Sequence, residues 1–281
     1  MKSITRILLL TDFSEISDNA MEYAVLIAKK TKAEIQVMHL INTPVDWVNI
    51  GVEKEKQYPE TRERIADARV QLNEVVSRFR DEGIIARPVL VYNMDVENIP
   101  EYVKDEDLDL IIMGSHGARG IKEFTIGSNA QKVLRTSIKP VLIVKKKPKY
   151  DSIKEVVFAS NFNKKWNKYF ESVLTFAEAF DARVHLLYIN TPYDFKETHE
   201  MDVLFDSYYS SCAEGTCTKH IYNASNEETG VKYFLKTQQP DVFAIVTEGR
   251  SAFSQIFSPS LTEKIVNHLD LPVLSINIHE K

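Results

Sequence analysis

The chain repeats itself once, and this duplication constrains its fold more than any other feature of the sequence. Residues 4–44 have a counterpart in residues 153–192, and both segments end in Asn-Thr-Pro. Residues 109–144 align without a gap on residues 241–276, which sets DLIIMGSHG against DVFAIVTEG. Such self-similarity predicts the same structural unit twice. The charged segment 145–152 (KKKPKYDS) lacks apolar periodicity and suits a linker. The sequence therefore predicts two domains, residues 1–147 and 151–281.

Within the first copy, short apolar runs alternate with segments of helical periodicity. The apolar runs are typical of doubly buried strands, and they lie at residues 7–10, 34–41, 87–92, 108–113 and 140–144. A helix is predicted from the serine cap at residue 14 to residue 31, and another over residues 61–83, ending at Gly83. Alternating strands and helices indicate a parallel sheet with helices on both faces. We therefore expect two tandem α/β units.

Composition and charge exclude several classes of protein. A net charge of −5 over 281 residues argues against a general nucleic-acid binder. The chain has no run of eighteen apolar residues, and Asp12 interrupts the apolar stretch near the N-terminus, so neither a membrane span nor a secretory signal is predicted. The only two cysteines, Cys212 and Cys217, cannot staple a chain of this length, which agrees with a reducing compartment. We expect a cytoplasmic protein with no nucleic-acid or membrane partner.

Four of the nine glycines lie in one segment, residues 111–128 (IIMGSHGARGIKEFTIGS), directly after the fourth predicted strand. In open α/β sheets, ligands bind beyond the carboxyl ends of the strands, where the winding direction reverses. Glycines allow close approach of the backbone, successive N–H groups can hold an anion, and a helix beginning near Gly127 presents unpaired donors. This segment therefore predicts a phosphate-binding loop. The alternative is a surface loop whose glycines only serve turns.

The spacing of these residues resembles the signature of a known family. Gly114, two residues, Gly117, nine residues, Gly127 and then Ser128 match the glycine motif of the universal stress protein family, and residues 8–41 are similar to its opening strand and helix. The resemblance is strong in residues 1–145 and degraded in residues 150–281, so the chain is identified as a tandem member. It implies five-stranded parallel sheets of the adenine nucleotide alpha hydrolase-like fold. It also implies a bound adenine nucleotide, usually ATP, with or without Mg²⁺.

The resemblance also implies a set of cofactor-binding residues. They are Asp12, Ile41, Met113, Gly114, Ser115, His116, Gly117, Gly127, Ser128 and Asn129. Asp12 and Ile41 would border adenine and ribose, Met113 and Gly114 would lie under the nucleoside, and the glycine segment would hold the phosphates. Two alternatives stay open from the residues themselves. Asp12 could only cap the helix that follows it, and the side chains of His116 and Arg119 could be solvated rather than reach phosphate.

The second copy has lost most of the motif. The alignment sets Val246 against Gly114 and Pro259 against Gly127, and Asn161 corresponds to Asp12. Val246 adds a branched side chain where the nucleoside would approach, and Pro259 removes an N–H at the predicted helix start. Residues 150–281 carry a net charge of −6 against +1 for residues 1–149, which further disfavours a polyanion. The sequence therefore predicts one nucleotide per chain, bound by the first copy.

No catalytic motif accompanies the predicted nucleotide site. Walker, kinase-like, GxSxG and HExxH patterns are absent from the sequence. We therefore expect a nucleotide-dependent regulatory protein of the stress response that is not an enzyme; the alternative is a slow Mg²⁺-dependent ATP hydrolase or nucleotidyl enzyme using the same crevice. Cys212, Cys217 and His220 match no strong metal pattern and are interpreted as loop residues. The last apolar run of each copy should pair with the other as an intrachain pseudo-dimer, and further homodimerisation stays open.

Overall fold

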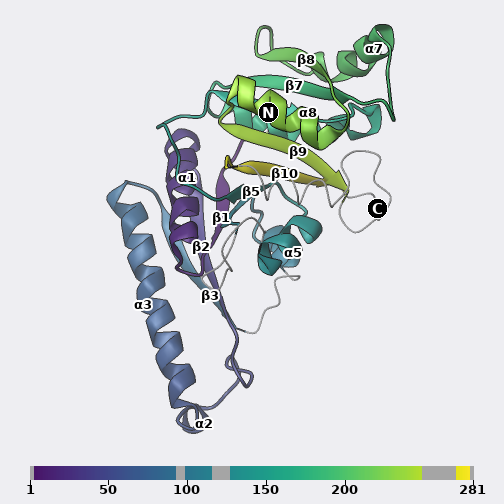
Figure 1. Ribbon diagram of the computed structural model, residues 1–281. Helices are drawn as coiled ribbons and strands as arrows, with labels where there is room; N and C mark the ends of the chain where they lie inside the picture. Colours follow the sequence, from purple (N-terminus) through teal and green to yellow (C-terminus); the bar gives the residue numbers. More distant parts are fainter. Residues whose placement is uncertain (1–2, 93–98, 116–126, 249–269, 279–281) are drawn as a thin grey trace.

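The computed structural model of the chain describes residues 3–92, 99–115, 127–248 and 270–278 (Figure 1). The first half contains β1 (Arg6–Leu10), α1 (Glu15–Thr31), β2 (Glu34–Ile41), α2 (Val52–Glu55), α3 (Pro59–Asp81), β3 (Ala86–Tyr92), α4 (Ile99–Asp105), β4 (Leu110–Gly114), α5 (Ser128–Thr136) and β5 (Val141–Val144). The second half contains β6 (Glu155–Ala159), the 3₁₀ helix η2 (Lys164–Trp166), α6 (Asn167–Glu178), β7 (Arg183–Asn190), α7 (Thr198–Tyr209), β8 (Cys217–Asn223), α8 (Glu227–Gln238), β9 (Val242–Glu248) and β10 (Val273–Ile278).

The ten strands in the described residues form one sheet with the order β3-β2-β1-β4-β5-β10-β9-β6-β7-β8. Each half contributes five strands that pair in parallel. The halves meet where β5 and β10 pair antiparallel, with Leu142 opposite Leu274. These are the last strands of the two copies, the pair that the sequence predicts to meet. The predicted fold class of two tandem five-stranded α/β units is confirmed.

The order of the strands places the helices on both faces of the sheet. In the first half the chain runs from β1 through β2 to β3, then returns to the other side of β1 for β4 and β5. Because parallel crossovers are right-handed, this reversal puts α1 and α3 on one face and α4 and α5 on the other. Arg78 of α3 lies 2.7 Å from Asp18 of α1, which links the two neighbouring helices (Figure 1). The winding reverses between β1 and β4.

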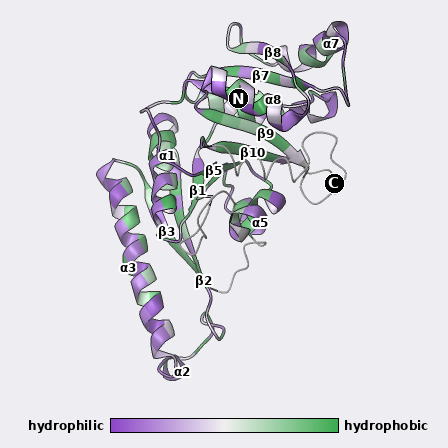
Figure 2. Cartoon of the chain, viewed as in Figure 1, coloured by the Kyte–Doolittle hydropathy of each residue, from purple (hydrophilic) through white to green (hydrophobic). Residues whose placement is uncertain are grey.

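The core is continuous across the junction of the halves. Every residue of β5 and β10 is buried, and all of them except Ser275 and Asn277 of β10 are apolar. Figure 2 shows most of β10 in the green of hydrophobic residues. The second half adds an aromatic cluster in which Phe158 lies 4.9 Å from Phe170 and Phe162 lies 4.5 Å from Phe205, measured between ring centroids. One contiguous apolar cluster includes residues of both halves. The halves are therefore packed as one body.

The two cysteines form a disulfide, which the sequence does not predict. Cys212 and Cys217 are bonded across a separation of 5 residues, so the bridge closes the short connection between α7 and β8. This pairing differs from the reduced cysteines expected of a reducing compartment. A disulfide sulfur offers no thiolate, so these cysteines and His220 do not share a metal site. In the described part of the chain, no three His, Cys, Asp or Glu side chains surround a possible metal position, and no helix is long and apolar enough to cross a membrane.

Candidate functional site

The predicted site lies at the carboxyl ends of β1, β2 and β4 in the first half. Strand β1 pairs with β2 on one side and with β4 on the other, so Leu10 is opposite both Met38 and Met113. Asp12 follows the end of β1, Ile41 ends β2 and Gly114 ends β4. The structure thus brings three predicted residues from distant parts of the sequence to one end of the sheet. This end is the winding reversal, where such sheets bind ligands.

Asp12 organises the turn between β1 and α1. Its Oδ1 accepts hydrogen bonds from the backbone N–H of Ser14 at 3.2 Å, the hydroxyl of Ser14 at 2.7 Å and the hydroxyl of Ser17 at 2.5 Å. Ser14 is the N-cap of α1 and accepts from the backbone N–H of Ser17. The sequence left open that Asp12 only caps the helix that follows it. In the structure Ser14 caps α1, and Asp12 supports this cap through its hydrogen bonds to Ser14. The same bonds hold the carboxylate in one place at the sheet edge.

Gly114 has a packing role that the sequence does not reveal. A Cβ at this position would lie 2.8 Å from Cγ2 of Ile16 and 3.2 Å from the backbone C and O of Ile16. Only glycine lets the end of β4 approach the first turn of α1 this closely. In the second half Val246 occupies the related position, and the regular helix α6 begins only at Asn167, after the 3₁₀ turn of η2. The alignment shows only the larger residue at the strand end, and the later helix start is seen in the structure.

An apolar wall lies beside Asp12. Ile41 is buried in a small cluster with Trp47 and Ile65, against which Phe13 packs. The ring of Phe13 lies 4.5 Å from the ring of His39, centroid to centroid, and Nδ1 of His39 is 2.9 Å from the carbonyl oxygen of Thr11. Met113 is buried in the main core. The sequence does not predict Phe13 and Trp47, because their proximity depends on the connection that follows β2.

The described residues on either side of the glycine segment are in contact. Ser115 is fully buried, its N–H donates to the carbonyl of Val144 at 2.8 Å, and its carbonyl accepts from the N–H of Gly127 at 2.8 Å. The backbone N–H of Gly127 therefore already donates a hydrogen bond within the protein. Gly127 caps α5 without a side-chain hydrogen bond, and Asn129 is exposed in the first turn. The predicted residues His116, Gly117 and Arg119, and the side chain of Ser128, lie outside the described residues.

Comparison with known proteins identifies the family. The model of the universal stress protein family matches residues 3–145. The chain belongs to this family. It is 29% identical over 156 residues to universal stress protein MJ0577 of Methanocaldococcus jannaschii, an alignment covering 50% of this chain and 95% of the relative.

Solved universal stress proteins include matches to the whole chain and to half of it. A structure from Archaeoglobus fulgidus DSM 4304 matches 99% of this chain and 98% of its own, with 22% identity and a TM-score of 0.75. This likeness supports the fold of the whole tandem chain. A universal stress protein solved in complex with cAMP is 24% identical and covers 52% of this chain and 100% of its own, with a TM-score of 0.40.

In this universal stress protein, the related end of the second half is built differently. Strand β9 continues past Val246 to Glu248 and pairs with β10, with Thr247 opposite Asn277. The corresponding β4–β5 pairing stops where Gly114 is opposite Val144. The turn after β6 nevertheless keeps its form, because Oδ1 of Asn161 accepts from the N–H of Asn163 at 3.2 Å, as Asp12 does from Ser14. The second half preserves the turn without its carboxylate.

Proposed function

We propose that this universal stress protein binds one adenine nucleotide per chain, ATP with or without Mg²⁺, and acts as a nucleotide-dependent regulator in the stress response. The observation that carries the proposal is the Asp12 carboxylate, held by three donors at the winding reversal beside the apolar wall of Phe13 and Ile41. We assign binding to residues 1–147. Residues 151–281 supply the paired strand at the junction.

The chemistry of this sheet edge suits a nucleoside. A carboxylate accepts hydrogen bonds from ribose hydroxyls or from an exocyclic amine, and such charge-assisted bonds are stronger than neutral ones. The rings and aliphatic groups of Phe13 and Ile41 suit contact with a flat base. The start of α5 carries no acidic residue in its first turn, so its N-terminal dipole is not offset by a negative side chain. Asn129, exposed in that turn, is our candidate for a phosphate contact.

The second half differs from the first at three related points. Asn161 replaces the carboxylate of Asp12 with a neutral amide, and Val246, which is 1% exposed, replaces Gly114. Strands β9 and β10 stay paired beyond the position at which the related pairing of β4 with β5 ends in the first half. These three differences support a stoichiometry of one nucleotide per chain.

A slow Mg²⁺-dependent ATP hydrolase or nucleotidyl enzyme is the alternative function of the same crevice. Hydrolysis requires a positioned base to activate water. Asp12 is an acidic side chain at this end of the sheet, and its Oδ1 already accepts three hydrogen bonds from the start of α1. Because these hydrogen bonds stabilise the ionised carboxylate, Asp12 is better suited to bind a nucleotide than to act as the base that activates water.

The test is a titration with a matched pair of variants. Equilibrium dialysis of the full chain with ATP should give about one nucleotide per chain, and Asp12→Asn should raise Kd about ten- to a hundredfold, because a hydrogen bond to a charged group is worth about 1.5–3 kcal/mol. Folding should survive, since Asn161 supports the same turn in the second half. The control Asn161→Asp should leave ATP binding unchanged.

Each outcome decides between specific readings. A stoichiometry near two, or an unchanged Kd in Asp12→Asn, would contradict the proposed site. Tighter binding of cAMP than of ATP would replace the proposed ligand. Steady-state phosphate release that Asp12→Asn abolishes would select the hydrolase.

A further inference from the structure

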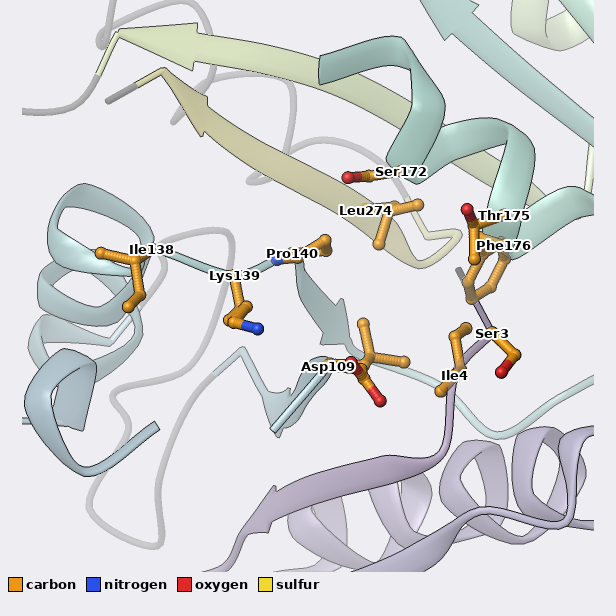
Figure 3. Close-up of a pocket in the computed structure, with 11 residues that line it drawn as sticks. Ser3, Ile4, Asp109, Ile138, Lys139, Pro140, Ser172, Thr175, Phe176 and Leu274 are labelled. Carbon is orange, nitrogen blue, oxygen red and sulfur yellow. The ribbon is translucent and has the colours of Figure 1, made fainter. Parts of the chain in front are cut away.

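A cavity lies at the junction of the two halves, at the end of the sheet opposite to the candidate nucleotide site. Its volume is about 270 Å³. Asp109 and Lys139, which precede β4 and β5, line it from the first half. Ser172, Thr175 and Phe176 of α6 line it from the second half, as Figure 3 shows. Any ligand bound there would contact both halves of the chain.

The internal duplication provides a related place for comparison. Strand registers align Arg6 with Glu155 and Glu34 with Arg183, so through the first helix each residue corresponds to the one 149 positions later. Two left-handed residues in each half agree with this alignment, including Phe13 with φ 64° and Phe162 with φ 54°. On this basis Ser172 corresponds to Tyr23. Asp109 corresponds to Asp241 in the gapless alignment of the later segments.

At the related place the tyrosine is buried near the aspartate. Tyr23 is 6% exposed, and burial together with the nearby negative charge of Asp241 raises its pKa to about 12. The two aspartates accept hydrogen bonds from backbone N–H groups at corresponding positions of the two halves. Oδ2 of Asp241 accepts from two successive N–H groups at the start of β6, at 2.7 and 3.0 Å. Oδ2 of Asp109 accepts from two successive N–H groups at the start of β1, at 2.9 and 3.2 Å, and also from the hydroxyl of Thr5 at 2.8 Å.

One difference between the two places is a large side chain that is present in one and missing in the other. Tyr23 brings a phenol towards Asp241, whereas Ser172 ends after a single carbon and a hydroxyl. The cavity beside Asp109 is lined on its apolar sides by Ile4, Phe176 and Leu274. A cavity with a carboxylate at one wall and apolar side chains around it matches the surroundings of a phenol.

We propose that this junction cavity binds a small phenol, with the aromatic ring against Phe176 and the hydroxyl donating to the Asp109 carboxylate. The ligand would replace the side chain that Tyr23 supplies at the related place. A volume of about 270 Å³ is at the lower limit of small-molecule sites, so the ligand carries one ring rather than two. Lys139 adds a positive charge to the same lining, which disfavours an amine, and the phenol must be neutral to donate to Asp109.

Binding of such a ligand would stabilise the docked arrangement of the two halves. The lining comes from both halves, so the complete site exists only while β5 and β10 are paired. A ligand that binds only this arrangement raises its stability in proportion to the logarithm of ligand concentration over Kd. The cavity would therefore give the chain a ligand response that is separate from the nucleotide site.

The test uses p-cresol, which has the structure of the tyrosine side chain, and toluene, which lacks the hydroxyl. In NMR titrations of the full chain, p-cresol should shift signals of Phe176 and Leu274. Toluene should bind about tenfold or more weakly, because it cannot donate the hydrogen bond that p-cresol makes to the Asp109 carboxylate. Ser172→Tyr should fill the cavity and abolish p-cresol binding. Ser172→Ala should retain it, and ATP affinity should be unchanged in both variants.

A second variant guards against misfolding of Ser172→Tyr. Thr175→Leu introduces the residue found at the related position, Leu26, and should also weaken p-cresol binding by narrowing the cavity. Absence of p-cresol binding to the wild type up to its solubility limit would overturn the proposal. So would equal binding of p-cresol and toluene, or undiminished binding in a folded Ser172→Tyr or Thr175→Leu protein.

Discussion

Gly114→Ala tests whether the end of β4 is glycine because of helix packing. The added methyl carbon would lie 2.8 Å from Cγ2 of Ile16 and 3.2 Å from two of its backbone atoms. The near side-chain atom is on a β-branched residue in a helix, which has one preferred χ1 rotamer, and the backbone atoms move only if α1 moves. Overpacking of this kind costs about 1–3 kcal/mol. We expect the free energy of unfolding to fall by that amount in urea denaturation followed by circular dichroism.

Two further variants separate this contact from a general effect of replacing glycine. At Gly51 an added Cβ meets no atom within 4 Å, so Gly51→Ala should change stability by less than about 0.5 kcal/mol. Ile16→Ala removes the nearest contact atom, so the double variant Gly114→Ala/Ile16→Ala should be more stable than the sum of the single effects predicts, by about 0.5 kcal/mol or more. Additive single effects, or a Gly114→Ala protein as stable as the wild type, would refute the packing argument.

Two other perturbations have defined outcomes. Burial and the neighbouring His185 lower the pKa of His220, so the unfolded chain takes up this proton first and stability falls as the pH drops below the ordinary histidine pKa of about 6.5. The midpoint temperature of thermal unfolding should decrease less between pH 7.5 and pH 5.5 in His220→Asn than in the wild type or in His199→Asn, which changes an exposed histidine and serves as the control. Equal decreases in all three proteins would contradict this. Asn277 of β10 donates to the carbonyl of Ser137 in the first half at 2.9 Å, so Asn277→Ala should cost about 1–3 kcal/mol in urea denaturation, and a loss below about 0.5 kcal/mol would show that this bond does not support the junction.

The fold, and the grouping of Asp12, Ile41 and Gly114 at one end of the sheet, could be predicted because both depend on patterns that are local or repeated. Apolar runs and helical periodicity define the helices and strands of each copy, and the second copy provides a check on the assignment made for the first. Once the sheet is parallel, residues that follow strands must gather at one edge, so Asp12, Ile41 and Gly114 could be grouped before their contacts were known. The turn after the first strand is even repeated chemically, with Asn161 accepting the hydrogen bond that Asp12 accepts.

What the sequence could not show depends on contacts between distant segments. The approach of Ile16 to Gly114 follows from how α1 lies on β4, and glycine at that position also fits a nucleotide-binding interpretation. The disulfide depends on the way α7 and β8 bring Cys212 and Cys217 together. The exchange of Tyr23 for Ser172 is visible in the alignment, but its meaning depends on the cavity that the paired halves enclose.

The difference between Tyr23 and Ser172 at related positions also illustrates what a tandem chain can do that a pair of identical chains cannot. In a symmetric dimer each substitution acts at both related places, so two crevices and two junction cavities stay equivalent. In this chain Val246 alters the end of β9 without altering β4, where Gly114 is retained. Ser172 likewise leaves space beside Asp109 while Tyr23 remains buried near Asp241. The two halves can therefore diverge at opposite ends of one sheet, so that the proposed nucleotide site and the proposed junction site can each change without the other.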